Sequence, residues 1–209
     1  TVWVQNANGV RSLVPLLDAI NCKELSDPNR LHTSVRDVSV NAVLTRSPDD
    51  FATGDQVFEN YGSDNHNNFF AHGFTLPNNS HDCVKVRIAY EGSDPIVIDN
   101  FRTRRLPVNS VHCLRRGKIP NQAMAVLQFL AQSTGRANAN EMLHDIIADK
   151  LAKYPTTLAE DLSELKQSRF IVRWEKRLAL EFIVEEKKLL REMRDDLGKQ
   201  LGLHQHTEL

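Results

Sequence analysis

Apolar and polar positions follow two different periods along this chain of 209 residues. Val84, Val86 and Ile88 alternate with Lys, Arg and Ala, which is the period of a strand with one buried face. A second short apolar run, 95–98, is bounded by turn residues and is typical of another strand. We therefore expect the first hundred residues to form short strands and loops.

From residue 119 onward the apolar positions recur at helical spacing. Pro120 suits the first turn of one helix, and Asn138 or Asn140 is expected to cap the next. The Thr pair at 156–157 opens a third helix, with two acidic residues in its first turn. A long last helix, about 169–197, is expected to pack inward with Trp174 buried. Its predicted apolar side comprises Ile171, Trp174, Leu178, Phe182, Leu189, Met193 and Leu197.

Composition excludes some classes of protein. With 26 Lys plus Arg against 27 Asp plus Glu, the net charge is -1, so nucleic acid is not an expected partner. No apolar run is long enough to span a bilayer, and no signal-peptide pattern opens the chain. Cys22, Cys83 and Cys113 are odd in number and widely spaced, so we expect no disulfide framework and an intracellular location.

Clustered histidines and arginines suggest two further kinds of site. His66, His72 and His81 lie close in sequence, but they form no i,i+4 pair and no metalloprotease motif, so no metal site is expected. A basic run lies between residues 101 and 118, where no acidic residue occurs. It is interpreted either as a face for an acidic substrate or as a solvated strap between domains. Its members are Arg102, Arg104, Arg105, Arg115, Arg116 and Lys118.

The segment 58–86 carries the most specific motif. A short apolar strand ends on Tyr61-Gly62, and a following apolar run closes on Gly73-Phe74 before an Asn-rich loop. Upstream, an apolar run leads through Asp18 to Asn21-Cys22. The two motifs, in this order and at this spacing, resemble SET-domain protein methyltransferases. The resemblance is to the branch of the Rubisco large-subunit and actin-histidine methyltransferases.

The C-terminal half resembles the substrate-binding domain of the same branch. The matching residues are Tyr154, Thr156-Thr157, Glu160-Asp161 and Arg177-Leu178-Ala179. The resemblance implies an α+β chain, with residues 1–100 as the C-terminal part of a SET-type β fold that contains a pseudoknot. Residues 105–209 are then an α-helical substrate-binding domain. The family's first SET segment is not found in this sequence, so we expect a piece of a longer protein that alone binds the cofactor weakly and is inactive.

The resemblance also assigns roles to individual residues. It implies that Tyr61 is catalytic and aligns the acceptor nitrogen beside the methyl group. It implies that Asn21, Cys22 and Phe74 bind S-adenosylmethionine, with Cys22 standing where the family usually has His. Asp18 is expected to brace the turn that carries Asn21. Asn65 matches an Asn of the motif, but the turn is one residue shorter here and its role is left open.

The function implied by the resemblance is methyl transfer to a protein side chain. We expect a protein-lysine N-methyltransferase that uses S-adenosylmethionine, acts on a protein substrate and is monomeric. Histidine methylation on actin is the sister activity. A protein-binding module without catalysis is the alternative from a different class.

Overall fold

A computed structural model describes residues 3–5, 11–13, 19–24, 33–37, 39–40, 42–47, 49–136, 138–167 and 173–203. Its strands form four pairs. β1 (Trp3–Gln5) pairs with β2 (Arg11–Leu13), and β4 (Thr33–Asp37) pairs with β5 (Ala42–Arg46), both antiparallel. β3 (Asn21–Cys22) runs parallel to β6 (Phe58–Glu59), and β7 (Cys83–Ala89) runs antiparallel to β8 (Asn109–Arg115). The predicted α+β class is confirmed.

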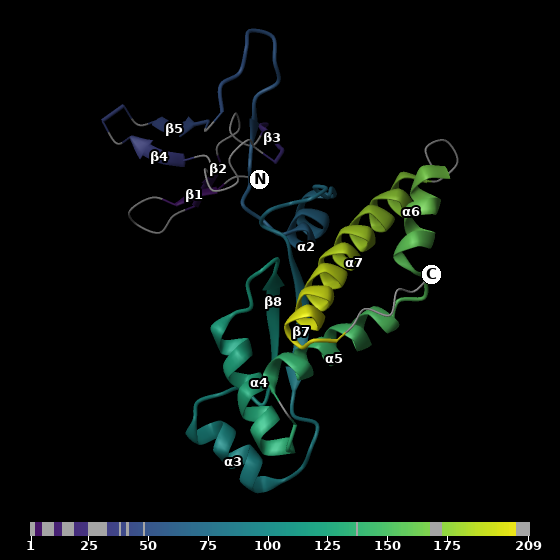
Figure 1. Cartoon of the computed structure of the whole chain (residues 1–209). Coiled ribbons are helices and arrows are strands. Elements are labelled where there is room, and N and C mark those ends of the chain that lie inside the picture. The colour runs from purple at the N-terminus through teal and green to yellow at the C-terminus, as the bar shows by residue number, and fades with distance from the viewer. Residues whose placement is uncertain are drawn as a thin grey trace.

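The long helices lie in the second half of the chain, as Figure 1 shows. Two short ones, α2 (Asn65–Asn67) and η1 (Asn68–His72), follow the Tyr61 segment, and α3 (Pro95–Thr103) follows β7. The four long helices are α4 (Asn121–Thr134), α5 (Ala139–Ala152), α6 (Leu158–Gln167) and α7 (Trp174–Gln200). The last four match the helices predicted from the apolar period. None of the described helices is long and apolar enough to cross a membrane.

The core forms where the long helices meet the β7–β8 hairpin. The alternation predicted for β7 is confirmed, since Val84, Val86 and Ile88 are buried. They join buried side chains from α4, α5 and α7 in one cluster that includes Leu127, Leu143 and Leu190. β8 lies beyond residue 105 and pairs with β7, so residues on both sides of the predicted domain boundary share this core.

The apolar run 95–98 is helical, and its prediction as a strand is wrong. Asp94 caps the helix, because its carboxylate accepts a hydrogen bond from the Ile96 backbone N–H at 2.9 Å. Pro95 then occupies the first helical turn, where its missing N–H costs nothing. A short apolar run does not distinguish a strand from a buried helix, and here the cap decides.

The prediction that Trp174 is buried is also wrong, because 69% of its surface is exposed. The side of α7 that faces α6 at this level carries Lys176, whose ammonium pairs with Glu164. Trp174 lies two residues earlier and therefore does not share the side of α7 that carries Lys176. Leu189, Met193 and Leu197 are buried as predicted, Leu178 and Phe182 are half-buried, and Ile171 lies outside the described residues.

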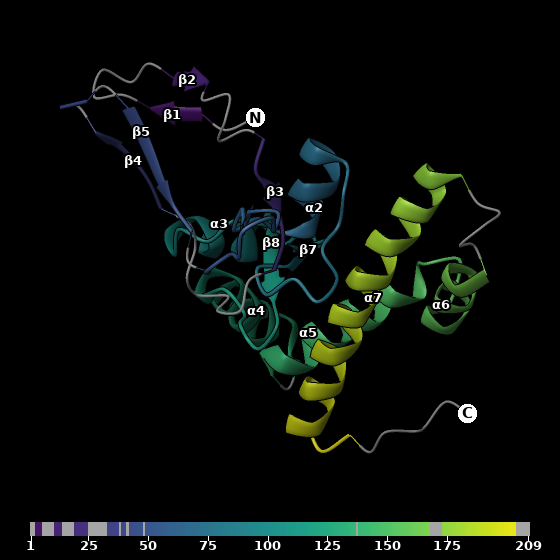
Figure 2. The ribbon, with the colours of Figure 1, turned by 90° about the horizontal axis from the view of Figure 1, so that it is seen from above.

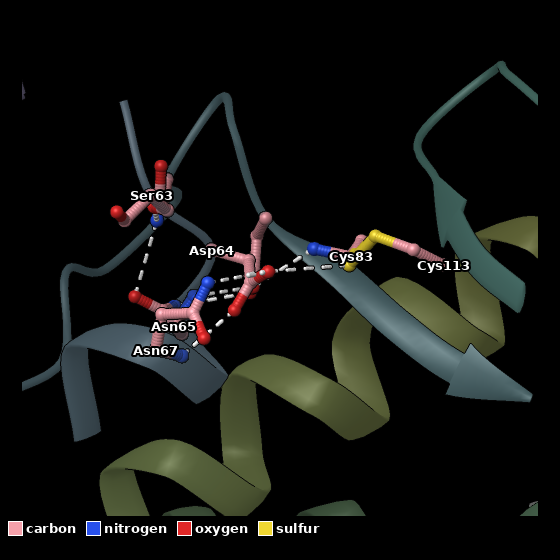
Figure 3. Close-up of a disulfide and its surroundings, with 8 residues drawn as sticks. Ser63, Asp64, Asn65, Asn67, Cys83 and Cys113 are labelled. Atoms are coloured by element: carbon pink, nitrogen blue, oxygen red, sulfur yellow. Dashed lines mark hydrogen bonds between the residues drawn. A yellow bond between two sulfur atoms is a disulfide. The ribbon is translucent and has the colours of Figure 1, made fainter. Parts of the chain in front are cut away.

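A disulfide joins Cys83 to Cys113, so the expectation of no disulfide is wrong for this pair (Figure 3). Antiparallel pairing sets Cys113 opposite Lys85, which makes Cys83 its diagonal neighbour, with the Cα atoms 5.4 Å apart. Sequence spacing alone does not reveal this register. The compartment inferred from the cysteines loses this support, and an intracellular location stays a prediction.

Breaking this bond should lower the free energy of unfolding by about 3 kcal/mol, because the bridge closes a loop with a sequence separation of 30. Urea unfolding monitored by circular dichroism, with and without reductant, measures the difference. The Cys83→Ala/Cys113→Ala variant serves as the control, because reductant should not change its midpoint. An equal midpoint for the native chain in both buffers would contradict a closed bridge.

Candidate functional site

The two N-terminal motifs meet where β3 lies beside β6. Asn21 pairs with Phe58 and Cys22 with Glu59, and the Lys23 backbone N–H donates to the Glu59 carbonyl at 3.0 Å. This parallel pairing brings the predicted cofactor residues to the strand that leads into Tyr61. Asn21 is exposed and Cys22 is half-buried, whereas Asp18 lies outside the described residues.

Tyr61 is fixed to the β3 segment at both its ends. Its hydroxyl donates to the Ile20 carbonyl at 2.8 Å, and its backbone N–H points at the Cys22 sulfur at 3.5 Å. Burial raises the pKa of the Cys22 thiol, so the sulfur remains a neutral acceptor near neutral pH. Cys22 therefore contributes a hydrogen bond of its own to the backbone of Tyr61.

Phe74 and His72 complete an aromatic cluster around Tyr61. The Tyr61 ring centroid lies 5.1 Å from that of His72 and 6.1 Å from that of Phe74, and those two lie 5.9 Å apart. Gly73 ends η1 in the left-handed conformation, with φ of 73°, which turns Phe74 back toward Tyr61. The structure thus brings Tyr61 and Phe74 together as predicted. It adds His72, which sequence reasoning considered only as a metal ligand.

A network of amide groups holds the loop 76–82 against the turn after Tyr61. The buried Asn65 side chain donates to the Leu76 carbonyl at 2.9 Å and to Asp82 at 3.0 Å, and it accepts from the Leu76 N–H at 2.9 Å. Asn79 donates to the Ser63 carbonyl at 2.9 Å. Burial raises the pKa of Asp82. Asn65, whose role the sequence left open, is therefore a brace of the turn that carries Tyr61.

The same loop also contacts the helical half of the chain. The Asn78 backbone N–H donates to the carboxylate of Glu185 on α7 at 2.8 Å. On η1, the Phe69 ring lies 5.0 Å from the Phe182 ring of α7. Helix α7 therefore supports the segment that carries the aromatic cluster. Figure 2 shows α2 beside α7.

The disulfide lies next to this brace rather than at a metal centre. Figure 3 shows Asp64, which caps α2, beside the disulfide. Its Oδ2 atom lies 3.7 Å from the Cys83 sulfur. Asp64, Cys83 and Cys113 offer ligand atoms within 4.8 Å of one another. Sulfurs joined in a disulfide are not thiolates, so this group is not a metal site while the bridge is closed.

The basic run does not form one surface. Arg102, Arg104 and Arg105 lie around the end of α3, whereas the other three follow each other at the end of β8. The seven residues of β8 separate the two groups by about 20 Å. The Arg104 guanidinium lies 4.9 Å from the Phe129 ring centroid, and Arg116 pairs with Glu192 at 2.5 Å.

Residues of the C-terminal motif hold α6 against α7 through buried polar contacts, which we call the α6–α7 lock. Lys187 of α7 is 2% exposed, and its ammonium donates to the Thr156 carbonyl at 2.6 Å and to the Thr156 hydroxyl at 3.0 Å. It also forms an ion pair with Asp161, whose side chain is equally buried. Thr157 and Glu160 exchange hydrogen bonds as a capping box at the start of α6. The sequence motif thus identifies residues that pack α6 against α7. Lys187, their partner on α7, lies outside the motif and could not be found from it.

The tyrosine of this motif contributes to the same lock. The Tyr154 hydroxyl hydrogen-bonds to Glu186, and the Lys187 ammonium lies 4.8 Å from the Tyr154 ring centroid. Burial, followed by the nearby Glu186 carboxylate, raises the pKa of Tyr154. The phenol therefore remains protonated and donates to the carboxylate.

Known proteins are similar to this chain in sequence. Residues 125–190 match the family model of the Rubisco LSMT substrate-binding domain. Over 119 residues the chain is 30% identical to the actin-histidine N-methyltransferase of Rattus norvegicus, which is 56% of this chain and 17% of that protein.

Solved structures extend the similarity over nearly the whole chain. The SET domain of LSMT bound to lysine and AdoHcy matches with a TM-score of 0.66 and 20% identity, over 94% of this chain and 52% of that one. Rubisco LSMT bound to AdoMet matches with a TM-score of 0.67 and 18% identity, over 95% and 53%. The chain spans about half the length of these proteins. Residues 125–190 thus match the substrate-binding family model, and the chain has the fold of part of Rubisco LSMT, as the resemblance in its sequence implied.

Proposed function

We propose that this chain is part of a protein-lysine N-methyltransferase that uses S-adenosylmethionine. The observation that carries the proposal is the placement of Tyr61. Its hydroxyl is fixed on the Ile20 carbonyl, directly before Asn21, and its ring lies against His72 and Phe74. Similar solved proteins bind AdoMet, AdoHcy or sinefungin.

The residues of the site fit the proposed cofactor. Asn21 presents an exposed side-chain amide, which has both donors and an acceptor for the amino and carboxylate groups of a bound amino acid. The half-buried Phe74 ring offers an apolar face for an adenine, and Cys22 offers its backbone groups. When bound, the cofactor supplies an electrophilic methyl group on a sulfonium.

Tyr61 orients the acceptor through its oxygen lone pairs. Because its hydroxyl proton is donated to Ile20, the oxygen keeps lone pairs that accept a hydrogen bond from the N–H of an incoming amine. The hydroxyl therefore acts on the amine as a hydrogen-bond acceptor that sets its orientation. The rings of His72 and Phe74 reduce the access of water to this oxygen.

Two acceptor side chains are supported by particular relatives. Solved structures of LSMT contain lysine or monomethyllysine, which favours a lysine acceptor here. The 30% identity to an actin-histidine N-methyltransferase favours a histidine acceptor as the second candidate.

Mass spectrometry can identify the acceptor. The complete protein is incubated with deuterated-methyl S-adenosylmethionine and a proteolysed cell extract, and labelled peptides are sequenced. We expect label on lysine, whereas label on histidine alone would replace lysine as the acceptor. No label above that of a heat-inactivated sample would contradict the proposed activity and favour a protein-binding module.

A further inference from the structure

A pocket of about 450 Å³ lies between α5, the start of α6 and α7. We call it the α5–α7 pocket. Its lining includes the apolar side chains of Leu151, Pro155 and Leu158. Its volume is within the range of pockets that hold small ligands or several side chains. It lies within residues 148–194, on the lock between α6 and α7, and it is separate from the aromatic cluster.

One wall of the pocket is cationic. Lys187, Arg191 and Arg194 line it from successive turns of α7, at the spacing that places side chains on one face of a helix. The buried Lys187 is neutralised by Asp161. Arg191 is exposed and forms no ion pair within the part of the chain that the structure describes. Two arginine side chains therefore remain as the charged groups of this wall.

The acidic groups around this wall are already engaged. Glu160 also lines the pocket, but one of its carboxylate oxygens accepts from the Thr157 N–H at 2.6 Å and from the Thr157 hydroxyl at 2.8 Å. Among the described residues, the ion pair of Arg194 is with its helix neighbour Asp195, at 3.1 Å. A guanidinium has five N–H donors, so both arginines retain donors for a further anion.

The position of the pocket distinguishes it from the methyl-transfer site. Phe182, which contacts η1, precedes Arg191 by nine residues, which is two and a half helical turns. The two side chains consequently lie on opposite sides of α7. A ligand in the pocket does not share the space around Tyr61.

We propose that the α5–α7 pocket binds an acidic, partly apolar segment of the protein substrate, away from the residue that is methylated. The identification of a substrate rests on the proposed function. Arginine pairs with carboxylates through two parallel hydrogen bonds, and the apolar side chains of Leu151, Pro155 and Leu158 accommodate neighbouring aliphatic side chains. The Glu160 carboxylate, which also lines the pocket, disfavours more highly charged anions such as phosphate.

Fluorescence anisotropy with a labelled peptide tests the proposal without methyl transfer. The probe is a ten-residue peptide of alternating Glu and Leu, and its counterpart carries Gln in place of Glu. We expect the chain to bind the Glu peptide, and Arg191→Glu/Arg194→Glu to weaken that binding about tenfold or more. The control Arg115→Glu/Lys118→Glu makes the same change in charge at the turn after β8 and should bind within about twofold of the native chain.

Several outcomes would overturn the proposal. These are equal binding of the Glu and Gln peptides, an equal loss in both double variants, or displacement of the peptide by inorganic phosphate at the concentration at which glutamate displaces it. The milder variant Arg191→Gln/Arg194→Gln repeats the measurement if charge reversal alters the circular dichroism spectrum. The peptide-binding assay contains no cofactor, so a negative result in it does not contradict the proposed methyl transfer. Peptide binding can also be measured if methyl transfer is not found.

Discussion

Lys187→Ala should lower the free energy of unfolding by about 3 to 5 kcal/mol, because it leaves the buried Asp161 carboxylate without its counter-charge. It also removes the donor to the carbonyl and the hydroxyl of Thr156. Urea unfolding followed by circular dichroism measures the change. Since the pair joins α6 to α7, the loss should appear in the cooperative transition of the helical half.

Two further variants separate the ion pair from general effects of charge. Lys199→Ala removes a lysine on the same helix whose pair with Asp196 is exposed, and it should cost about 0.5 kcal/mol or less. Replacing both partners, as Lys187→Met/Asp161→Leu, should recover most of the loss, because no charge then remains buried. If Lys187→Ala and Lys199→Ala were equally stable, the buried pair would not be the lock between these helices.

Tyr61→Phe in the complete protein should reduce turnover by roughly 10²-fold, which is about 3 kcal/mol in activation free energy. The ring and its contacts with His72 and Phe74 remain in this variant, so cofactor affinity should be unchanged. Only the hydroxyl is lost, and with it the oxygen that orients the acceptor. A methylation assay on the acceptor peptide identified by mass spectrometry measures turnover, and calorimetry in parallel measures cofactor binding.

The hydrogen bond to Ile20 requires a control, since its loss alone should cost about 1 kcal/mol of stability. Cys22→Ala removes the other contact between Tyr61 and β3 but leaves the hydroxyl in place. It should therefore reduce turnover much less than Tyr61→Phe does. Full turnover in the Phe variant would remove Tyr61 from the mechanism, and parallel loss of cofactor binding would make its role structural.

The sequence by itself determined the features that depend on near neighbours. The Thr157–Glu160 capping box and the buried alternation in β7 follow from residues a few positions apart, and the cap at Asn138 is one of the two positions that the sequence allowed. Such contacts form whenever the local backbone forms, so their patterns can be read directly. The motif around Tyr61 is equally local, and its resemblance to a known family indicated the fold. The same kind of local pattern gave a wrong prediction for the run 95–98, which was expected to be a strand and is helical because Asp94 caps it.

Only the tertiary structure decided which distant residues meet. The register of β7 against β8 brings Cys83 to Cys113, and the length of β8 separates the basic residues at the end of α3 from those at the end of β8. The rotation of α7 exposes Trp174 and turns Lys187 onto Asp161. The turn at Gly73 brings His72 to Tyr61. Each of these depends on how elements are placed against one another, and burial sets that placement by the fit of whole faces rather than by any single residue.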